Sequence, residues 1–180
     1  MALRTLRQQG DAILHKISKP VRNFNTQLHD LIDDMWDTIY EHDGYGLAAV
    51  QVGVLRRVLL LRLPASEDEP DAEDECYEVL NPQVLECEGE KANDEACLSV
   101  PVKMGSVVRP TRIKITAQDR DGEPFELEVT DTLAIVLSHE MDHLDGILFL
   151  DKATSIWDRP AAEDNEDSEN SEDSEKGGKK

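Results

Sequence analysis

The sequence Ser-His-Glu-Met-Asp-His-Leu-Asp-Gly spans residues 138–146, and the rest of the chain can be understood around it. His139 and His143 are four residues apart, so on a helix they lie on one face, about one turn apart. Glu140 is close enough to reach a water molecule on a metal ion held by both imidazoles. This is the H-E-x-x-H arrangement, in which two histidines bind a divalent metal and the glutamate acts as general base. The stretch therefore predicts a metal-binding helix.

The residues around this motif also favour a helix. The chain offers a polar cap at residues 130–131, an apolar run at 133–137 and a glycine stop at 146. Ile135 and Val136 precede the first histidine by about one turn, so they would face the same side and can line an apolar side-chain pocket. The alternative is a solvated, acidic helix end with incidental histidines, but the apolar turns just before the motif place the pair at the edge of a core.

Two histidines do not complete a metal site, and the third ligand must come from upstream. The extended metalloprotease pattern H-E-x-x-H-x-x-G-x-x-H is followed through Gly146, but its last position is Phe149. The acidic tail has too few apolar residues to dock a helix that could supply a glutamate. Cys97 alone would more often be a small buried hydrophobe, but beside two histidines it becomes the favoured third donor. A thiolate and two imidazoles leave one open coordination position and suit Fe(II), Zn or other first-row ions.

Length and composition limit the class of protein. The 180 residues fit one domain, and most of the net charge of −20 lies in two acidic segments, residues 67–75 and 163–175. Such a surface argues against nucleic acids and anionic membranes as direct partners. No segment approaches the roughly 18 apolar residues of a membrane span, and the first residues lack the apolar run of a secretory signal. Three cysteines without framework spacing suit a reducing cytosol, so we expect a cytoplasmic protein.

The remaining segments predict a mixture of helix and strand. Residues 26–42 carry apolar side chains at helical spacing, and residues 58–63, apolar at every position except Arg62, predict a buried strand. The glycine-rich residues 43–53 allow close backbone approach; a phosphate loop is the alternative, but no Gly-Lys-Ser/Thr follows. The other expected elements are an irregular arm (1–25), an acidic loop (64–75), a strand ended by Asn81-Pro82 (77–80), a hairpin (113–118 with 125–130) and a disordered acidic tail (156–180).

Three separated blocks occur in order along the chain: Gly-Tyr-Gly-Leu-Ala-Ala-Val-Gln at 44–51, Glu-Ala-Cys-Leu-Ser at 95–99 and His-Glu-Met-Asp-His at 139–143. Together they resemble the peptide deformylases, and the likeness covers most of residues 1–151. The resemblance implies an α+β fold with antiparallel strands around a central metal-binding helix, an N-terminal helix and a catalytic domain at 1–155. It also implies removal of the N-formyl group from the starting methionine of new bacterial or organellar proteins, with release of formate.

The resemblance further implies a role for each matched position. Three residues would hold one divalent metal ion, with Fe(II) favoured in the cell and Zn, Ni or Co as alternatives: Cys97, His139 and His143. Glu140 would be the acid/base, while Gln51 and the backbone N–H of Leu98 would donate hydrogen bonds to the oxyanion. Five residues would contact the substrate: Gly44, Tyr45, Gly46, Ile135 and Val136. The expected partners in the bacterial cytoplasm are N-formylmethionyl nascent peptides, with transient ribosome association.

The sequence departs from the family pattern at three places. Ala96 stands where the family usually has glycine, Tyr45 where it usually has isoleucine or valine, and the acidic tail replaces a C-terminal helix common in some members. Two alternative functions use the same residues. One is a zinc endopeptidase, whose third ligand position is Phe149 here, and the other is a non-catalytic protein that binds formyl-methionine chains. Intact Cys97, Glu140 and Gln51 argue against the non-catalytic protein.

Overall fold

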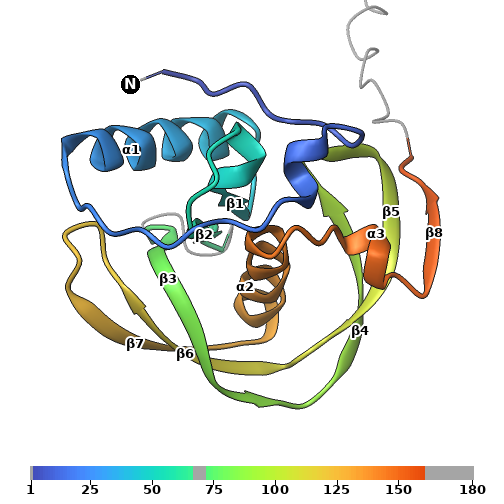
Figure 1. Ribbon diagram of the computed structural model, residues 1–180. Helices are drawn as coiled ribbons and strands as arrows, with labels where there is room; N and C mark the ends of the chain where they lie inside the picture. Colours follow the sequence, from blue (N-terminus) through green and yellow to red (C-terminus); the bar gives the residue numbers. More distant parts are fainter. Residues whose placement is uncertain (1, 67–71, 161–180) are drawn as a thin grey trace, which may run out of the picture.

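The computed structural model describes residues 2–66 and 72–160, which form an α+β fold (Figure 1). Within these residues, two antiparallel sheets surround a central helix: a five-stranded sheet in the order β1-β2-β3-β6-β7 and a three-stranded sheet in the order β4-β5-β8. The elements are η1 (Ala12–His15), α1 (Thr26–Glu41), β1 (Gly46–Ala48), η2 (Ala49–Val52), β2 (Val58–Leu63), β3 (Glu75–Glu88), β4 (Lys91–Cys97), β5 (Val100–Arg109), β6 (Arg112–Gln118), β7 (Pro124–Thr130), α2 (Asp131–Leu144), α3 (Phe149–Lys152) and β8 (Ser155–Asp158). The expected fold class and central helix α2 are confirmed.

The apolar run of β2 is buried on both faces of the five-stranded sheet. Leu59 and Leu61 pack with α2 and with strands β6 and β7. Val58 and Leu60 pack with the apolar stripe of α1. Successive side chains of a strand point to opposite faces, so a strand covered on both sides must be apolar at every position. One helix on each face of the sheet therefore explains the unbroken run, and it places α2 in the interior.

The N-terminal arm is hydrogen-bonded to η2, the short 3₁₀ helix that contains Gln51. The Arg7 N–H donates to the Gln51 carbonyl at 2.7 Å, and the Gln9 N–H donates to the Ser99 carbonyl at 2.8 Å. The arm is irregular, as expected, apart from the single 3₁₀ turn η1. It leads into α1, where the Asn25 side chain accepts a hydrogen bond from the Leu28 N–H at 3.1 Å and caps the helix.

The strand expected to end at Asn81-Pro82 continues, and that prediction was wrong. β3 runs on to Glu88, with a register shift against β6 between Leu80 and Gln83. Asn81 has a positive φ of 52°, and its side chain accepts from the Val21 N–H at 2.8 Å and donates to the Val21 carbonyl at 3.0 Å. A bulge of this kind accommodates a residue pair that cannot join the ladder, so the strand bends instead of stopping. The predicted β2 strand and the β6–β7 hairpin are confirmed.

The three-stranded sheet was not predicted from the sequence. β4 reads Lys-Ala-Asn-Asp-Glu-Ala-Cys and has few residues of high strand propensity, so its conformation comes from pairing with β5. β8 pairs with β5 from Ser155 to Asp158, and the domain boundary expected after residue 155 therefore falls inside a strand. Most of the expected disordered tail, residues 161–180, lies outside the described residues.

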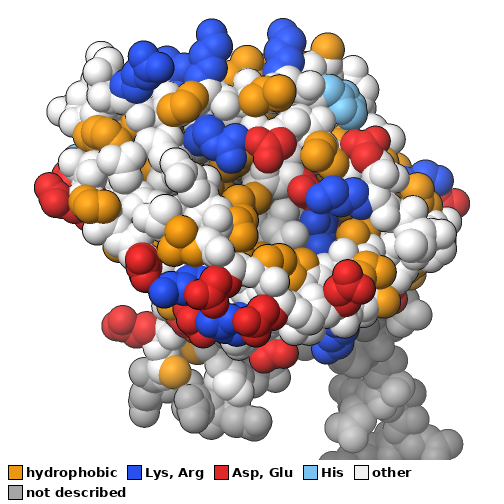
Figure 2. Space-filling view, turned by 60° about the horizontal axis from the view of Figure 1, so that its bottom comes forward, with side chains coloured by type: hydrophobic (Ala, Val, Ile, Leu, Met, Phe, Trp, Pro, Cys, Tyr) orange, Lys and Arg blue, Asp and Glu red, His pale blue; other side chains and the backbone are white. Residues whose placement is uncertain are grey.

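The surface carries charges of both signs. Figure 2 shows acidic and basic side chains intermingled on the face it displays, with several Lys and Arg side chains along its upper edge. In the part of the chain that the structure describes, no helix is long and apolar enough to span a bilayer.

Candidate active site

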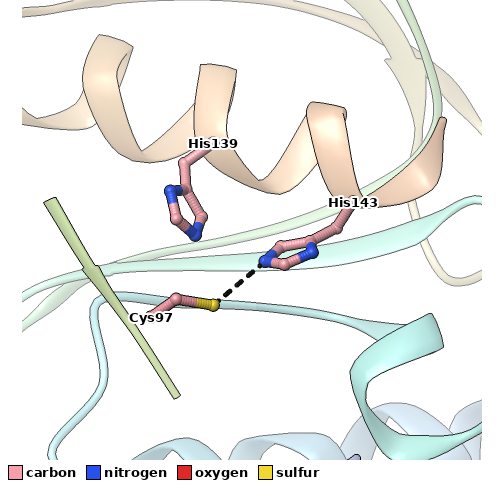
Figure 3. A group of neighbouring side chains, drawn as sticks. All are labelled: Cys97, His139 and His143. Atoms are coloured by element: carbon pink, nitrogen blue, oxygen red, sulfur yellow. Dashed lines mark hydrogen bonds between the residues drawn. The ribbon is translucent and has the colours of Figure 1, made fainter. Parts of the chain in front are cut away.

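Helix α2 and the end of β4 bring the three predicted metal ligands together. The ligand atoms of Cys97, His139 and His143 all lie within 4.8 Å of one another (Figure 3). Cys97 Sγ is 3.3 Å from His143 Nε2, and the two imidazole rings are 4.9 Å apart with an interplanar angle of 74°. The histidine spacing in the sequence is sufficient to align the rings on one helix face, and the sheet supplies the sulfur.

A buried carboxylate, Glu95, orients the first histidine. Its Oε2 lies 2.8 Å from His139 Nδ1. Burial alone would raise the pKa of Glu95, but hydrogen bonds from Arg109 and His139 outweigh it and lower the pKa to about 2. Because the carboxylate is ionised, Nδ1 must be the donor, which leaves Nε2 to face the sulfur and the second ring. A carboxylate behind a ligating histidine is the usual way to set its tautomer and orientation.

Arg109 lies at the centre of this supporting network. It is 2 % exposed, and it donates to both Glu95 oxygens at 2.6 and 2.9 Å and to Asp142 Oδ2 at 2.6 Å. Burial opposes the charged guanidinium, but the two carboxylates raise the pKa of Arg109 above its usual value. Asp142 in turn accepts from Lys152 Nζ at 2.6 Å, so the network reaches from β5 through α2 to α3.

No role for these supporting residues was predicted from the sequence. Glu95 and Asp142 lie inside the quoted blocks, and an acid two residues before the cysteine was a usable signal. Arg109 had no comparable signal, because it lies on a strand that was not predicted and contacts Glu95 only through the β4–β5 pairing.

The predicted acid/base residue, Glu140, is buried at the site. It is 4 % exposed, and within the described residues its Oε2 has no hydrogen-bond partner. Burial raises the pKa of Glu140 to about 7. Burial also lowers the pKa of His143 and favours the neutral ring that a metal ligand requires. The donor set of Cys97, His139 and His143, together with an unpaired buried carboxylate oxygen beside it, fits a catalytic metal and its water.

The amide of Gln51 faces the same place. It is 1 % exposed; its Oε1 accepts from the Ala48 N–H at 2.7 Å, which fixes the opposite end of the amide toward the site. Nε2 lies 3.6 Å from Cys97 Sγ and 3.3 Å from Ser99 Oγ. The side chain is therefore held with its donor nitrogen beside the metal ligand.

The predicted site residues line one cleft of about 430 Å³, except His143, which lies outside its lining. Ile135 and Val136 form part of an apolar wall on α2, and Tyr45, 48 % exposed, stands at the rim. A larger hollow of about 650 Å³ lies between residues 19–25 and α1 and contains none of the predicted site residues.

Gly46 allows β1 to approach α2 closely, and Gly46→Ala should reduce activity. A Cβ at this position would lie 2.7 Å from Glu140 Oε1 and 2.8 Å from Val136 Cγ1, so either the strand or the glutamate must move. Displacing an active-site group by about 1 Å can lower the reaction rate up to roughly 10²-fold. We therefore expect kcat/KM of Gly46→Ala to fall at least about 10-fold. Gly44→Ala is the comparison within the same cleft wall, because its Cβ would come closest to the end of the flexible Leu98 side chain, at 3.2 Å, with its other neighbours at ordinary contact distances of 3.7 and 3.8 Å. Equal losses in the two variants, measured by steady-state kinetics, would contradict the close-approach argument.

Comparison with known proteins assigns the family. The chain matches the family model described as polypeptide deformylase over residues 3–158. It is 44 % identical over 163 residues to a peptide deformylase of Acetivibrio thermocellus, covering 91 % of each chain. The peptide deformylase of Ehrlichia chaffeensis in complex with actinonin is 32 % identical, with a TM-score of 0.79 over 86 % of this chain and 90 % of that one. The Met-Ala-Ser-bound class I type b peptide deformylase of Acinetobacter baumannii is 32 % identical, with a TM-score of 0.77 over 84 % of this chain and 98 % of that one. The chain belongs to the peptide deformylase family.

Proposed function

We propose that Glu140, Gln51 and the backbone N–H of Leu98 carry out the chemistry of this deformylase at a metal held by Cys97, His139 and His143. Family membership makes the enzyme a hydrolase that removes the N-formyl group from the N-terminal methionine of newly made proteins. The observation that carries the residue roles is the convergence of an unpaired buried carboxylate and a fixed amide donor on three metal-ligating side chains.

Each residue has a task that follows from its place in the cleft. A divalent metal bound there would lower the pKa of a water molecule and polarise the formyl oxygen. Glu140 accepts the proton of the attacking water and returns it to the departing amine. The amide of Gln51 and the Leu98 N–H donate hydrogen bonds to the oxygen on which negative charge develops. The neighbouring wall formed by Ile135 and Val136 receives the apolar methionine side chain.

Membership of the family supports proposals for the substrate, the metal and the location. The Acinetobacter baumannii relative was crystallised with Met-Ala-Ser bound, which supports a peptide beginning with methionine as the ligand of this cleft. We propose Fe(II) as the metal in the cell, because the resemblance to the peptide deformylases favours it; a thiolate and two imidazoles suit Fe(II), Zn, Ni and Co alike. We also propose that the enzyme acts on nascent chains in the bacterial cytoplasm and associates transiently with the ribosome.

The function is tested by formate release from formyl-Met-Ala, with the enzyme loaded anaerobically with Fe(II) and, in parallel, with Zn, Ni or Co. Formate and free Met-Ala should appear in equal amounts, and Fe(II) should give the highest kcat/KM. Cleavage of an internal peptide bond would favour an endopeptidase instead. Tight binding of formyl-Met-Ala without formate release under all four metals would favour the non-catalytic protein.

The two departures near the cleft should differ in their effects. Ala96 does not have a positive φ, so an alanine in this position causes no backbone strain. Ala96→Gly should therefore change kcat and KM little. Tyr45 stands at the cleft rim, where its ring narrows the mouth, and Tyr45→Ile should alter KM and the preference among residues after methionine. Steady-state kinetics on a formyl-Met-Xaa panel compares the two variants. A large gain in kcat for Ala96→Gly without an effect of Tyr45→Ile would reverse this ranking.

A further inference from the structure

Arg159 is a charged side chain at the cleft that the proposed chemistry does not use. It follows β8, and its N–H donates to the Val102 carbonyl at 3.0 Å, so the backbone is held against β5. It lines the same cleft as Cys97 and Glu140, and its side chain is exposed. Among the described residues, its guanidinium has no hydrogen-bond or ion-pair partner.

The lack of an acidic partner distinguishes Arg159 from most of the other arginines, and its place in the cleft distinguishes it from the rest. Of the ten arginines in the described chain, seven lie within 4.0 Å of an acidic side chain: Arg4, Arg7, Arg57, Arg62, Arg109, Arg112 and Arg120. Arg22 and Arg56 line the hollow beside α1, away from the site. Arg159 is thus the one arginine of the described residues that combines a free guanidinium with a place in the catalytic cleft.

The strand register places Arg159 near the path of the peptide. Cys97 pairs with Val100 across β4 and β5, and Val102 lies two residues farther along β5 beside Arg159. Two residues along a strand and two strand spacings put the Cα atoms of Cys97 and Arg159 on the order of 12 Å apart. A distance of about 12 Å equals the length of roughly three to four residues of extended peptide. The arginine side chain reaches over part of this distance. This distance puts the guanidinium within reach of the second and third residues of a peptide whose formyl group lies at Cys97, His139 and His143.

The two exposed acids of the cleft lining, Asp43 and Asp94, do not cancel this cation. Asp43 pairs with Arg62 at 2.9 Å. Asp94 lies on β4 opposite Ser106, on the other side of β5 from Arg159. Four residues along β5 and two strand spacings separate the two side chains by roughly 17 Å. That separation exceeds the Debye length of about 8 Å at physiological ionic strength, so the two charges act on different parts of a peptide.

We propose that Arg159 is a specificity-determining residue that favours acidic side chains, and disfavours basic ones, at the second and third residues of the formyl-methionyl substrate. The proposal rests on the deformylase function and adds a charge preference to it. Contacts between a partly exposed arginine and a carboxylate change kcat/KM by about two- to fivefold. A Glu-to-Lys exchange in the substrate combines one attraction with one repulsion, so we expect a ratio of roughly tenfold.

The test measures kcat/KM of the full-length enzyme on formyl-Met-Ala-Xaa and formyl-Met-Xaa-Ala, where Xaa is Glu, Gln or Lys. Each variant is normalised to its own Gln peptide. The wild-type order should be Glu above Gln above Lys, and the ratios should shrink in 1 M salt. Arg159→Gln should reduce the Glu/Lys ratio to near one, and Arg159→Glu should invert it. Arg56→Gln removes the same charge away from the cleft and should keep the wild-type ratio.

A binding measurement separates this proposal from the catalytic one. Calorimetry with Met-Ala-Glu and Met-Ala-Lys requires no turnover, and Arg159→Gln should abolish their difference in Kd. If no formate is released but this difference is present and depends on Arg159, the catalytic roles fail while the charge preference holds. An unchanged Glu/Lys ratio in Arg159→Gln, or an equal change in Arg56→Gln, would overturn the proposal.

Discussion

Replacing Glu140 by glutamine is expected to lower kcat on formyl-Met-Ala at least about 10²-fold while the metal content of the purified enzyme stays unchanged. Glutamine has nearly the same size and can form hydrogen bonds, but it cannot carry a proton between water and the departing amine. The side chain is 4 % exposed and lies beside the metal ligands without being one of the three that converge. Loss of turnover with retained metal is therefore the signature of an acid/base residue.

The measurement combines steady-state kinetics with elemental analysis on the same preparation. Glu126→Gln is a suitable control, because Glu126 pairs with Lys114 on the surface of β7, far along the sheet from the cleft. It should leave kcat and metal content at their wild-type values. Near-normal turnover in Glu140→Gln would remove Glu140 from its proposed role.

Replacing Arg109 by methionine is expected to destabilise the metal-loaded protein by about 3–5 kcal/mol, because it leaves the buried Glu95 carboxylate without its cation and Asp142 paired with Lys152 alone. Glu95 and Asp142 both depend on this guanidinium, and Glu95 holds the His139 ring. For a domain of this size the loss corresponds to a fall in Tm of roughly 6–20 °C. The affinity for the metal should fall about 10- to 100-fold, as expected when the group behind a ligating histidine loses its support.

Thermal unfolding at a fixed metal concentration and competition with a chelator measure the two effects. Arg112→Met is the matched control, because Arg112 also contacts carboxylates of neighbouring strands, Glu86 and Glu128, but on the solvent-facing surface. Its Tm and metal affinity should stay close to wild type. Adding Glu95→Gln to Arg109→Met should recover part of the lost stability, since the unpaired buried charge of Glu95 is then removed. An Arg109→Met protein with unchanged Tm and metal affinity would contradict the role of the network.

Local sequence patterns were sufficient to predict the helices and strands in which the spacing of apolar side chains follows from which faces are buried. The apolar stripe of α1 and the continuous run of β2 predicted a surface helix and a buried strand, and both are present. The two histidines of α2 were aligned by helical spacing alone, and their convergence with Cys97 is observed. In each case the burial of one face or both faces leaves a periodic signature in the chain.

Pairing between segments far apart in the chain determined the conformation of the strands that have no such sequence pattern. β4 is polar and becomes a strand only through its bonds to β5, while β3 passes Asn81-Pro82 because Val21 and a bulge accommodate the irregular pair. Arg109 shows the same effect at the site, since its pairing with Glu95 depends on two strands meeting in register. Residue identity and spacing therefore predicted the three side chains that converge and the acid/base candidate. Their support, and the position of Arg159 at the cleft, depend on contacts between segments far apart in the chain, which no local pattern encodes.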